Sequence, residues 1–169
     1  MKSDYLQGVN MAYTKGVFKE QKFDENLLGY TVAEDIDFSY RLSMQYPNSI
    51  WITPYAKLSH RNSQKGRAPT KVISYINQAD HFYFFFKNLN DSFKNKIIFA
   101  WSLFGILSLR LSLAVFKPNK TNFLKFWYFL SSLSYCLFNI DKIKNGKLRE
   151  WKNVDSYSFI KDLKCHLEL

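Results

Sequence analysis

The sequence predicts an α/β domain followed by long apolar helices, and three patterns carry that prediction. Residues 49–60 are rich in β-branched and aromatic side chains and are broken by Pro54, which favours a strand, a turn and a short strand. Residues 69–88 place apolar side chains at helical spacing. Two apolar runs follow at 97–116 and 123–138. We therefore expect short strands and helices first, and helices alone after them.

An acidic cluster lies within the predicted α/β part, where Glu34, Asp35 and Asp37 fall within four positions. Thr31 and Glu34 match the S/T-x-x-E capping box, and acidic side chains suit the N-terminus of a helix. Asp37 and Arg41 stand four residues apart, the spacing of an ion pair on a helix. Local chemistry alone therefore predicts a capped helix start.

Residues 67–93 predict an amphipathic connecting helix that occupies about 69–88 and ends in the turn-forming residues 88–91. The residues of its apolar stripe are Val72, Tyr75, Ile76, Ala79, Phe82, Tyr83 and Phe86. The other face would present Lys71, Ser74, Asn77, Gln78, Asp80 and His81.

Residues 94–140 predict an apolar helical hairpin that associates with a membrane. The first run holds one charge, Arg110, and its 20 residues would reach about 30 Å as a helix, enough to cross a bilayer core. Near the centre of the bilayer, Arg110 would raise the free energy of insertion by about 2.5–3.5 kcal/mol, but its long side chain can snorkel to the interface. The second run is shorter and contains Lys125. A hairpin that dips into one leaflet or lies in the interface is favoured over a spanning one; packing against protein alone is the third alternative.

The net charge of +10 belongs almost entirely to the second part of the chain. Residues 1–66 hold 8 basic and 7 acidic side chains, whereas residues 67–169 hold 16 and 7. The residues that border the apolar runs are Lys94, Lys96, Lys117, Lys120, Lys142, Lys144, Lys147 and Arg149. Basic borders of this kind suit an anionic membrane surface. Because they flank apolar runs and do not form a stacking platform, no nucleic-acid partner is expected.

The two cysteines and the first ten residues bear on location. Cys136 and Cys165 give neither a disulfide framework nor the spacing of a metal site, and Cys136 is expected to be a small apolar residue. The first ten residues lack the apolar stretch of a signal peptide. We expect a location at the cytoplasmic face of the cell membrane, with a basic polar tail over 141–169.

Four short motifs follow one another in the first 63 residues. They read "GVNMAYTKGVF" at 8–18, "KFDENLLGY" at 22–30, "AEDIDFSYRL" at 33–42 and "IWITPYAKLSHRNS" at 50–63. In this order and spacing they resemble the downstream part of the catalytic domain of family 2 glycosyltransferases, which are inverting enzymes of the GT-A fold that use nucleotide sugars. The resemblance implies that residues 1–66 are the acceptor-side part of a GT-A-like α/β domain.

The resemblance also implies roles for single residues. Asp35 matches the Asp of the family's Glu-Asp pair, the usual general base. Glu34 would orient the acceptor or tune the ionisation of its neighbour, since two adjacent carboxylates disfavour each other's ionisation. Gly8, Asn10 and Met11 match the loop and helix start that line the family's acceptor site.

The donor side is expected to be incomplete in this sequence. His60 matches a position at which a histidine helps to bind the metal or the diphosphate in several family members, and Arg61 and Arg67 could meet phosphate charge. The family implies Mg²⁺ or Mn²⁺, but its Asp-x-Asp metal motif does not precede Gly8. We therefore expect the C-terminal portion of an enzyme, whose upstream half would hold the nucleotide-diphosphate sugar.

The expected activity is sugar transfer from a nucleotide-sugar donor to a glycan or lipid-linked acceptor. The resemblance points to cell-surface polysaccharide assembly and to a rhamnosyltransferase-like enzyme. The alternative is a non-catalytic, basic, membrane-associated protein in which the acidic cluster only caps a helix.

Overall fold

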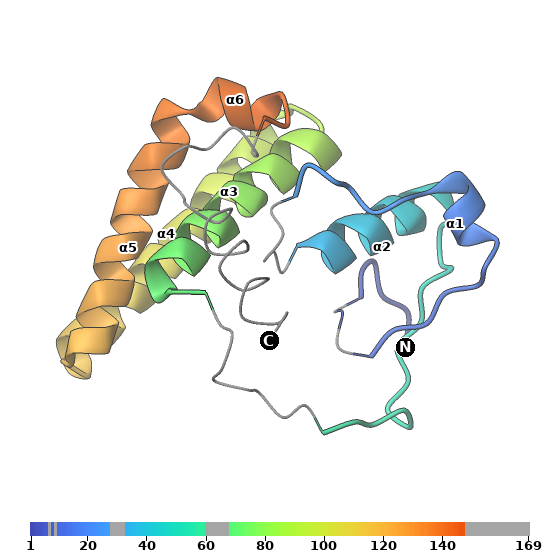
Figure 1. Cartoon of the computed structure of the whole chain (residues 1–169), viewed down its shortest axis with the longest axis horizontal. Coiled ribbons are helices and arrows are strands. Elements are labelled where there is room, and N and C mark those ends of the chain that lie inside the picture. Colours follow the sequence, from blue (N-terminus) through green and yellow to red (C-terminus); the bar gives the residue numbers. More distant parts are fainter. Residues whose placement is uncertain (7, 9, 28–32, 60–67, 148–169) are drawn as a thin grey trace, which may run out of the picture.

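The computed structural model describes residues 1–6, 8, 10–27, 33–59 and 68–147, and 63% of these residues are helical. The helices are α1 (Val17–Glu20), α2 (Glu34–Gln45), α3 (Thr70–Asn88), α4 (Phe93–Phe116), α5 (Lys120–Phe138) and α6 (Ile140–Lys144). Figure 1 shows α3 between the α1–α2 part of the chain and the pair formed by α4 and α5.

The predicted α/β class is wrong, because the described residues form no strand and no sheet. In place of the strand, turn and short strand predicted at 49–60, the structure has one isolated antiparallel bridge between Lys2 and Trp51. Backbone hydrogen bonds of 3.1 and 2.8 Å flank this bridge. A strand must satisfy its N–H and C=O groups through neighbouring strands. The described residues supply one short partner here, and Pro54 lacks an N–H group.

Helix α2 begins two residues later than the capping box predicts. Its N-cap is Ala33, so Glu34 is the first helical residue, and Thr31 lies outside the described residues. The predicted ion pair on this helix is confirmed, since Arg41 Nε lies 2.9 Å from Asp37 Oδ2.

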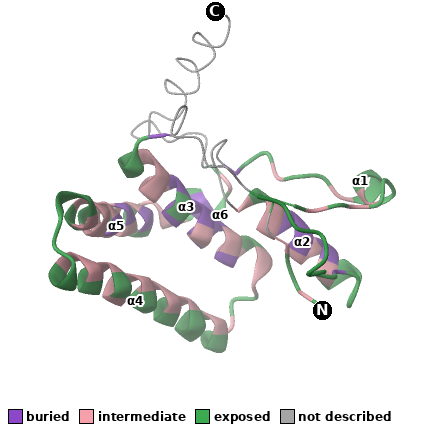
Figure 2. Ribbon diagram, turned by 90° about the horizontal axis from the view of Figure 1, so that it is seen from below, coloured by how far each residue is buried: buried purple, intermediate pink, exposed green. Residues whose placement is uncertain are grey.

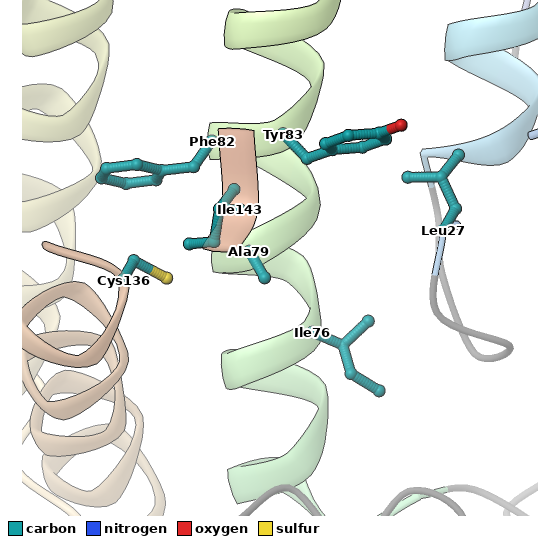
Figure 3. Packing of buried hydrophobic residues seen from close by; sticks show 7 residues of the cluster. All are labelled: Leu27, Ile76, Ala79, Phe82, Tyr83, Cys136 and Ile143. Atoms are coloured by element: carbon teal, nitrogen blue, oxygen red, sulfur yellow. The ribbon is translucent and has the colours of Figure 1, made fainter. Parts of the chain in front are cut away.

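Helix α3 matches the predicted connecting helix, and its apolar stripe forms the centre of the core. Four residues of this stripe pack with three residues from other segments (Figure 3). The cluster consists of Leu27 from the loop before α2, Ile76, Ala79, Phe82 and Tyr83 from α3, Cys136 from α5 and Ile143 from α6. Cys136 is fully buried, as expected of a small apolar residue.

The predicted polar face of α3 is wrong at two positions, because Gln78 and Asp80 are buried. His81 is half-buried, and its ring lies 5.0 Å from that of Phe99 on α4. This burial lowers the pKa of His81. The reason is that α3 has neighbours on several sides, namely α2, α5, α6 and the first turns of α4.

The predicted hairpin is formed by α4 and α5, which pack against each other. Ser92 caps α4 by accepting a hydrogen bond from the Asn95 N–H, and Asn119 caps α5 in the same way through Asn122. Helix α4 contains no buried residue, and Figure 2 shows it along one edge of the molecule with an exposed outer face. Among the described helices, α4 alone is long and apolar enough to cross a membrane.

Replacement of the core residue Ile76, which is 0% exposed, by alanine should lower the free energy of unfolding by about 2–5 kcal/mol, because it leaves a cavity within the core cluster. The matched control is Ile97→Ala on α4. Ile97 is 53% exposed, and its replacement should change stability by about 0.5 kcal/mol or less. Urea denaturation followed by circular dichroism measures both. Equal losses would contradict the assignment of the core to α3.

Candidate functional site

The first turn of α2 presents Asp35 beside the N-terminal segment. The Gly8 N–H donates a hydrogen bond to Asp35 Oδ2, and the Ile36 N–H donates one to Oδ1 at 2.9 Å. The carboxylate is therefore oriented by two backbone donors, one of them 27 residues away in the chain.

Glycine at position 8 permits the close approach of its backbone to Asp35. A Cβ atom built on Gly8 would lie 2.5 Å from Asp35 Oδ2, well inside van der Waals contact. The atom it meets is the end of a side chain that can rotate, so a larger residue at position 8 would displace the carboxylate. The role of Gly8 is thus to fit closely against Asp35.

Two residues for which the sequence predicts no role, Ser39 and Tyr13, lie beside this contact. Ser39, one turn after Asp35, is fully buried; its hydroxyl accepts from the Leu6 N–H at 2.8 Å and donates to the Asp35 carbonyl oxygen at 2.6 Å. Tyr13 packs its ring edge-on against Phe38 at 5.0 Å. Burial and, in smaller measure, the charge of Asp35 raise the pKa of Tyr13 above its usual value, whereas Ser39 lowers it.

Glu34 lies at the exposed start of the same helix. Partial burial and the neighbouring charge of Asp35 raise the pKa of Glu34. This is the direction expected for two adjacent carboxylates, each of which disfavours ionisation of the other.

The other predicted site residues are placed elsewhere. Asn10 donates through Nδ2 to the Ala56 carbonyl oxygen at 3.0 Å, and the Tyr13 hydroxyl donates to Met11 Sδ at 3.5 Å. Of the three predicted acceptor-side residues, Gly8 is therefore the one that hydrogen-bonds to the acidic cluster. The predicted donor-side residues His60, Arg61 and Arg67 lie outside the described residues.

No metal donor set forms in the part of the chain that the structure describes. No three His, Cys, Asp or Glu side chains gather there in a way that could hold an ion. The described residues by themselves therefore form no site for the expected Mg²⁺ or Mn²⁺, and the predicted ligand His60 lies outside them.

A charged cluster behind Asp35 fixes the position of α2. Asp37 is 1% exposed and accepts hydrogen bonds from Arg41, Lys87 and Asn88 at 2.8–2.9 Å. Lys87 Nζ also lies 2.6 Å from Asp24 Oδ2. One ammonium group thus joins α3 to α2 and to the loop before it.

The hydrogen bonds of this cluster shift the pKa values of Asp24 and Tyr83 in opposite directions. Burial by itself would raise the pKa of Asp24, but the hydrogen bonds from Lys87, the Asn26 N–H and Tyr83 outweigh it and hold the pKa below its usual value. Burial and the bond to Asp24 raise the pKa of Tyr83 to about 12. Asp24 belongs to one of the four motifs, and its contacts with Lys87 and Tyr83 link the loop before α2 to α3.

An open groove of about 520 Å³ lies between α1 and the C-terminal half of α2. Its lining residues are Ala12, Tyr13, Thr14, Gly16, Val17, Glu20, Leu42, Tyr46 and Ser49. Tyr13 belongs both to this groove and to the surroundings of Asp35. The groove therefore offers a mixed polar and apolar surface, and Tyr13 is the lining residue that feels the charge of Asp35.

Comparison with protein-family models, with curated proteins and with solved structures finds no match. The likeness to family 2 glycosyltransferases consequently rests on the four motifs alone.

Removal of the shared cation by Lys87→Met should destabilise the fold by about 3 kcal/mol, because it leaves the buried Asp37 and the adjacent Asp24 without their common partner. The matched control is Lys96→Met, which breaks the exposed Lys96–Asp91 pair and should cost about 1 kcal/mol or less. Urea denaturation at neutral pH compares the two. A loss for Lys87→Met no larger than the control would show that the cluster does not fix α2.

Proposed function

We propose that this chain provides the acceptor side of a glycosyltransferase and that Asp35 is its general base. The observation that carries the proposal is the contact between Gly8 and Asp35. Two of the four motifs, separated in sequence, meet at one carboxylate. That carboxylate stands at a partly exposed helix start, where a sugar hydroxyl can reach it.

The proposed reaction needs a positioned base on the acceptor. Asp35 takes the proton of the acceptor hydroxyl as its oxygen forms a bond to the anomeric carbon of the donor sugar. The bond from that carbon to the diphosphate breaks, its electron pair leaves with the nucleoside diphosphate, and the configuration at the carbon inverts. A positioned base of this kind contributes about 10²–10⁴ in rate.

The surroundings of Asp35 suit this role in three ways. Its two observed backbone donors leave carboxylate lone pairs for an acceptor hydroxyl. The helix that carries it is held by the ion pair between Lys87 and the buried Asp37, and a rigid support favours precise placement of a base. Glu34, at the exposed helix start, stands where it can contact the acceptor.

The remaining components of the proposed enzyme are a nucleotide-diphosphate sugar, an upstream half that binds it, and a glycan or lipid-linked acceptor. His60, Arg61 and Arg67 remain the proposed metal and diphosphate contacts. We place the reaction at the cytoplasmic face of the cell membrane, where a lipid-linked acceptor would be available.

A second candidate is a non-catalytic membrane-associated protein, and the exposed apolar surface of α4 favours it. In that case the chain would bind membranes, and no combination with an upstream half would give dependence on nucleotide sugars.

The isosteric change Asp35→Asn tests the base. In the chain joined to its upstream half, it should lower transfer of radiolabelled sugar by about 10²–10⁴ while circular dichroism and unfolding stay unchanged. Asp4→Asn is the control, because Asp4 is exposed near the N-terminus and should retain activity. Unchanged transfer by Asp35→Asn would refute the assignment.

The change Gly8→Ala tests the contact that positions the base. The added methyl group should rotate the Asp35 carboxylate away and lower the rate, by up to about 10² for a displacement near 1 Å, with little loss of stability. Gly16→Ala is the control, since nothing lies within 4 Å of a Cβ atom at Gly16. Equal rates for the two variants would show that Gly8 does not position Asp35.

A further inference from the structure

The outer face of α4 is a continuous apolar stripe that the rest of the described chain leaves uncovered. The exposed apolar side chains spread over about half of the circumference of the helix, opposite the side that carries Phe99 and Leu103. The members with the largest exposed side chains are Ile97, Ile98, Trp101, Phe104, Leu109, Leu111, Val115 and Phe116. A single soluble chain rarely leaves so long a patch open to water.

The one charge within this run does not interrupt the stripe. Arg110 is partly buried, whereas Leu109 and Leu111 on either side of it are exposed. By helical periodicity Arg110 shares the side of Phe99, Ile106 and Leu113, the inward side. The outward stripe is therefore free of charge from residue 97 to residue 116.

The packing of the hairpin restricts how α4 can meet a membrane. Phe99 near the start of α4 stacks on Phe85 of α3 at 4.3 Å, and Tyr135 of α5 contacts Tyr75 of α3 at 5.7 Å. Helix α3 is in turn joined to α2 by Lys87. A hairpin that crossed the bilayer would draw the buried polar groups of α3 into it, so these contacts favour a helix that lies flat on the membrane.

Charge at the two ends of α4 identifies the lipid. Lys94 is exposed in the first turn, and Lys117 and Lys120 are exposed at the turn to α5. Lys96 is also exposed, although it pairs with Asp91 at 2.8 Å. A basic residue near an anionic surface contributes about 1 kcal/mol of attraction. An apolar stripe between basic ends is the pattern of a helix in the interface of an anionic bilayer.

We propose that α4 lies in the plane of an anionic phospholipid membrane, with its stripe from Ile97 to Phe116 inserted among the lipid chains and Arg110 on the protein side. This inference rests on the membrane association contained in the proposed function. It concerns lipid binding alone, so its test does not depend on sugar transfer.

Binding of the full chain to vesicles tests whether an anionic membrane covers the apolar stripe of α4. The chain should float with vesicles that contain phosphatidylglycerol and bind phosphatidylcholine vesicles more weakly, and high salt should remove this difference. Trp101→Glu should lower the partition coefficient by about tenfold or more. Trp51→Glu replaces another exposed tryptophan, outside α4, and should change it by less than about twofold. Equal losses for the two variants, or a chain that forms dimers and does not float, would overturn the proposal.

The depth of insertion distinguishes a flat helix from a spanning one. Three variants, Ile97→Trp, Phe104→Trp and Leu111→Trp, each place one tryptophan on the stripe. The three positions stand about 10 Å apart along α4. In chains whose other tryptophans are changed to phenylalanine, quenching by lipids brominated at defined carbons should give one shallow depth for all three. Depths that change progressively across the bilayer would show a spanning helix and contradict the flat orientation. If Asp35→Asn proved harmless while these depths were equal, the base assignment alone would fail.

Discussion

The arrangement of the described chain depends on one ammonium group, that of Lys87. It lies between Asp24 and Asp37, and through them it joins the loop before α2, helix α2 and the last turn of α3. Few other contacts connect α2 to α3. A carboxylate as buried as that of Asp37 is costly without a partner, so the cluster is stable only when all of its members are present. The position of Asp35, two residues before Asp37, therefore depends on an interaction on the opposite side of the helix.

Helix α3 connects this cluster to the rest of the molecule. Its apolar stripe holds α5 and α6, its C-terminal turn holds α2, and Phe85 holds the start of α4. Contacts on so many sides explain why Gln78 and Asp80 are buried, although the sequence predicts them on the polar face. Helical periodicity identifies the most apolar side of a helix. It does not show how many neighbours the helix will have, because that depends on contacts between distant segments.

In the rest of the chain too, features that depend on local spacing could be predicted, whereas features that depend on contacts between distant segments could not. The bounds of α3, the hairpin of α4 and α5 and the Asp37–Arg41 pair depend on spacing within about one helical turn, and the structure confirms them. The strands predicted at 49–60 required partners from far along the chain, and the described residues provide one bridge. At the candidate site, the sequence motifs indicated Asp35 and Gly8 as separate residues. The hydrogen bond between them could not be predicted, because it joins segments 27 residues apart in the chain. Ser39 had no signal beyond its place one turn after Asp35.

If α4 lies flat on a membrane and Asp35 is a base, the fold relates these two features through α3. One side of α3 is joined to α2, and the α5–α4 pair packs on another side. The first attachment depends on the ion pair between Lys87 and the buried Asp37, and the second on packed apolar side chains. Together they would hold the carboxylate at a fixed height above the lipid. An acceptor anchored in that membrane would lose less translational and rotational freedom on reaching the base than one in solution. If both proposals hold, a lipid-linked acceptor would be the substrate class that uses both features.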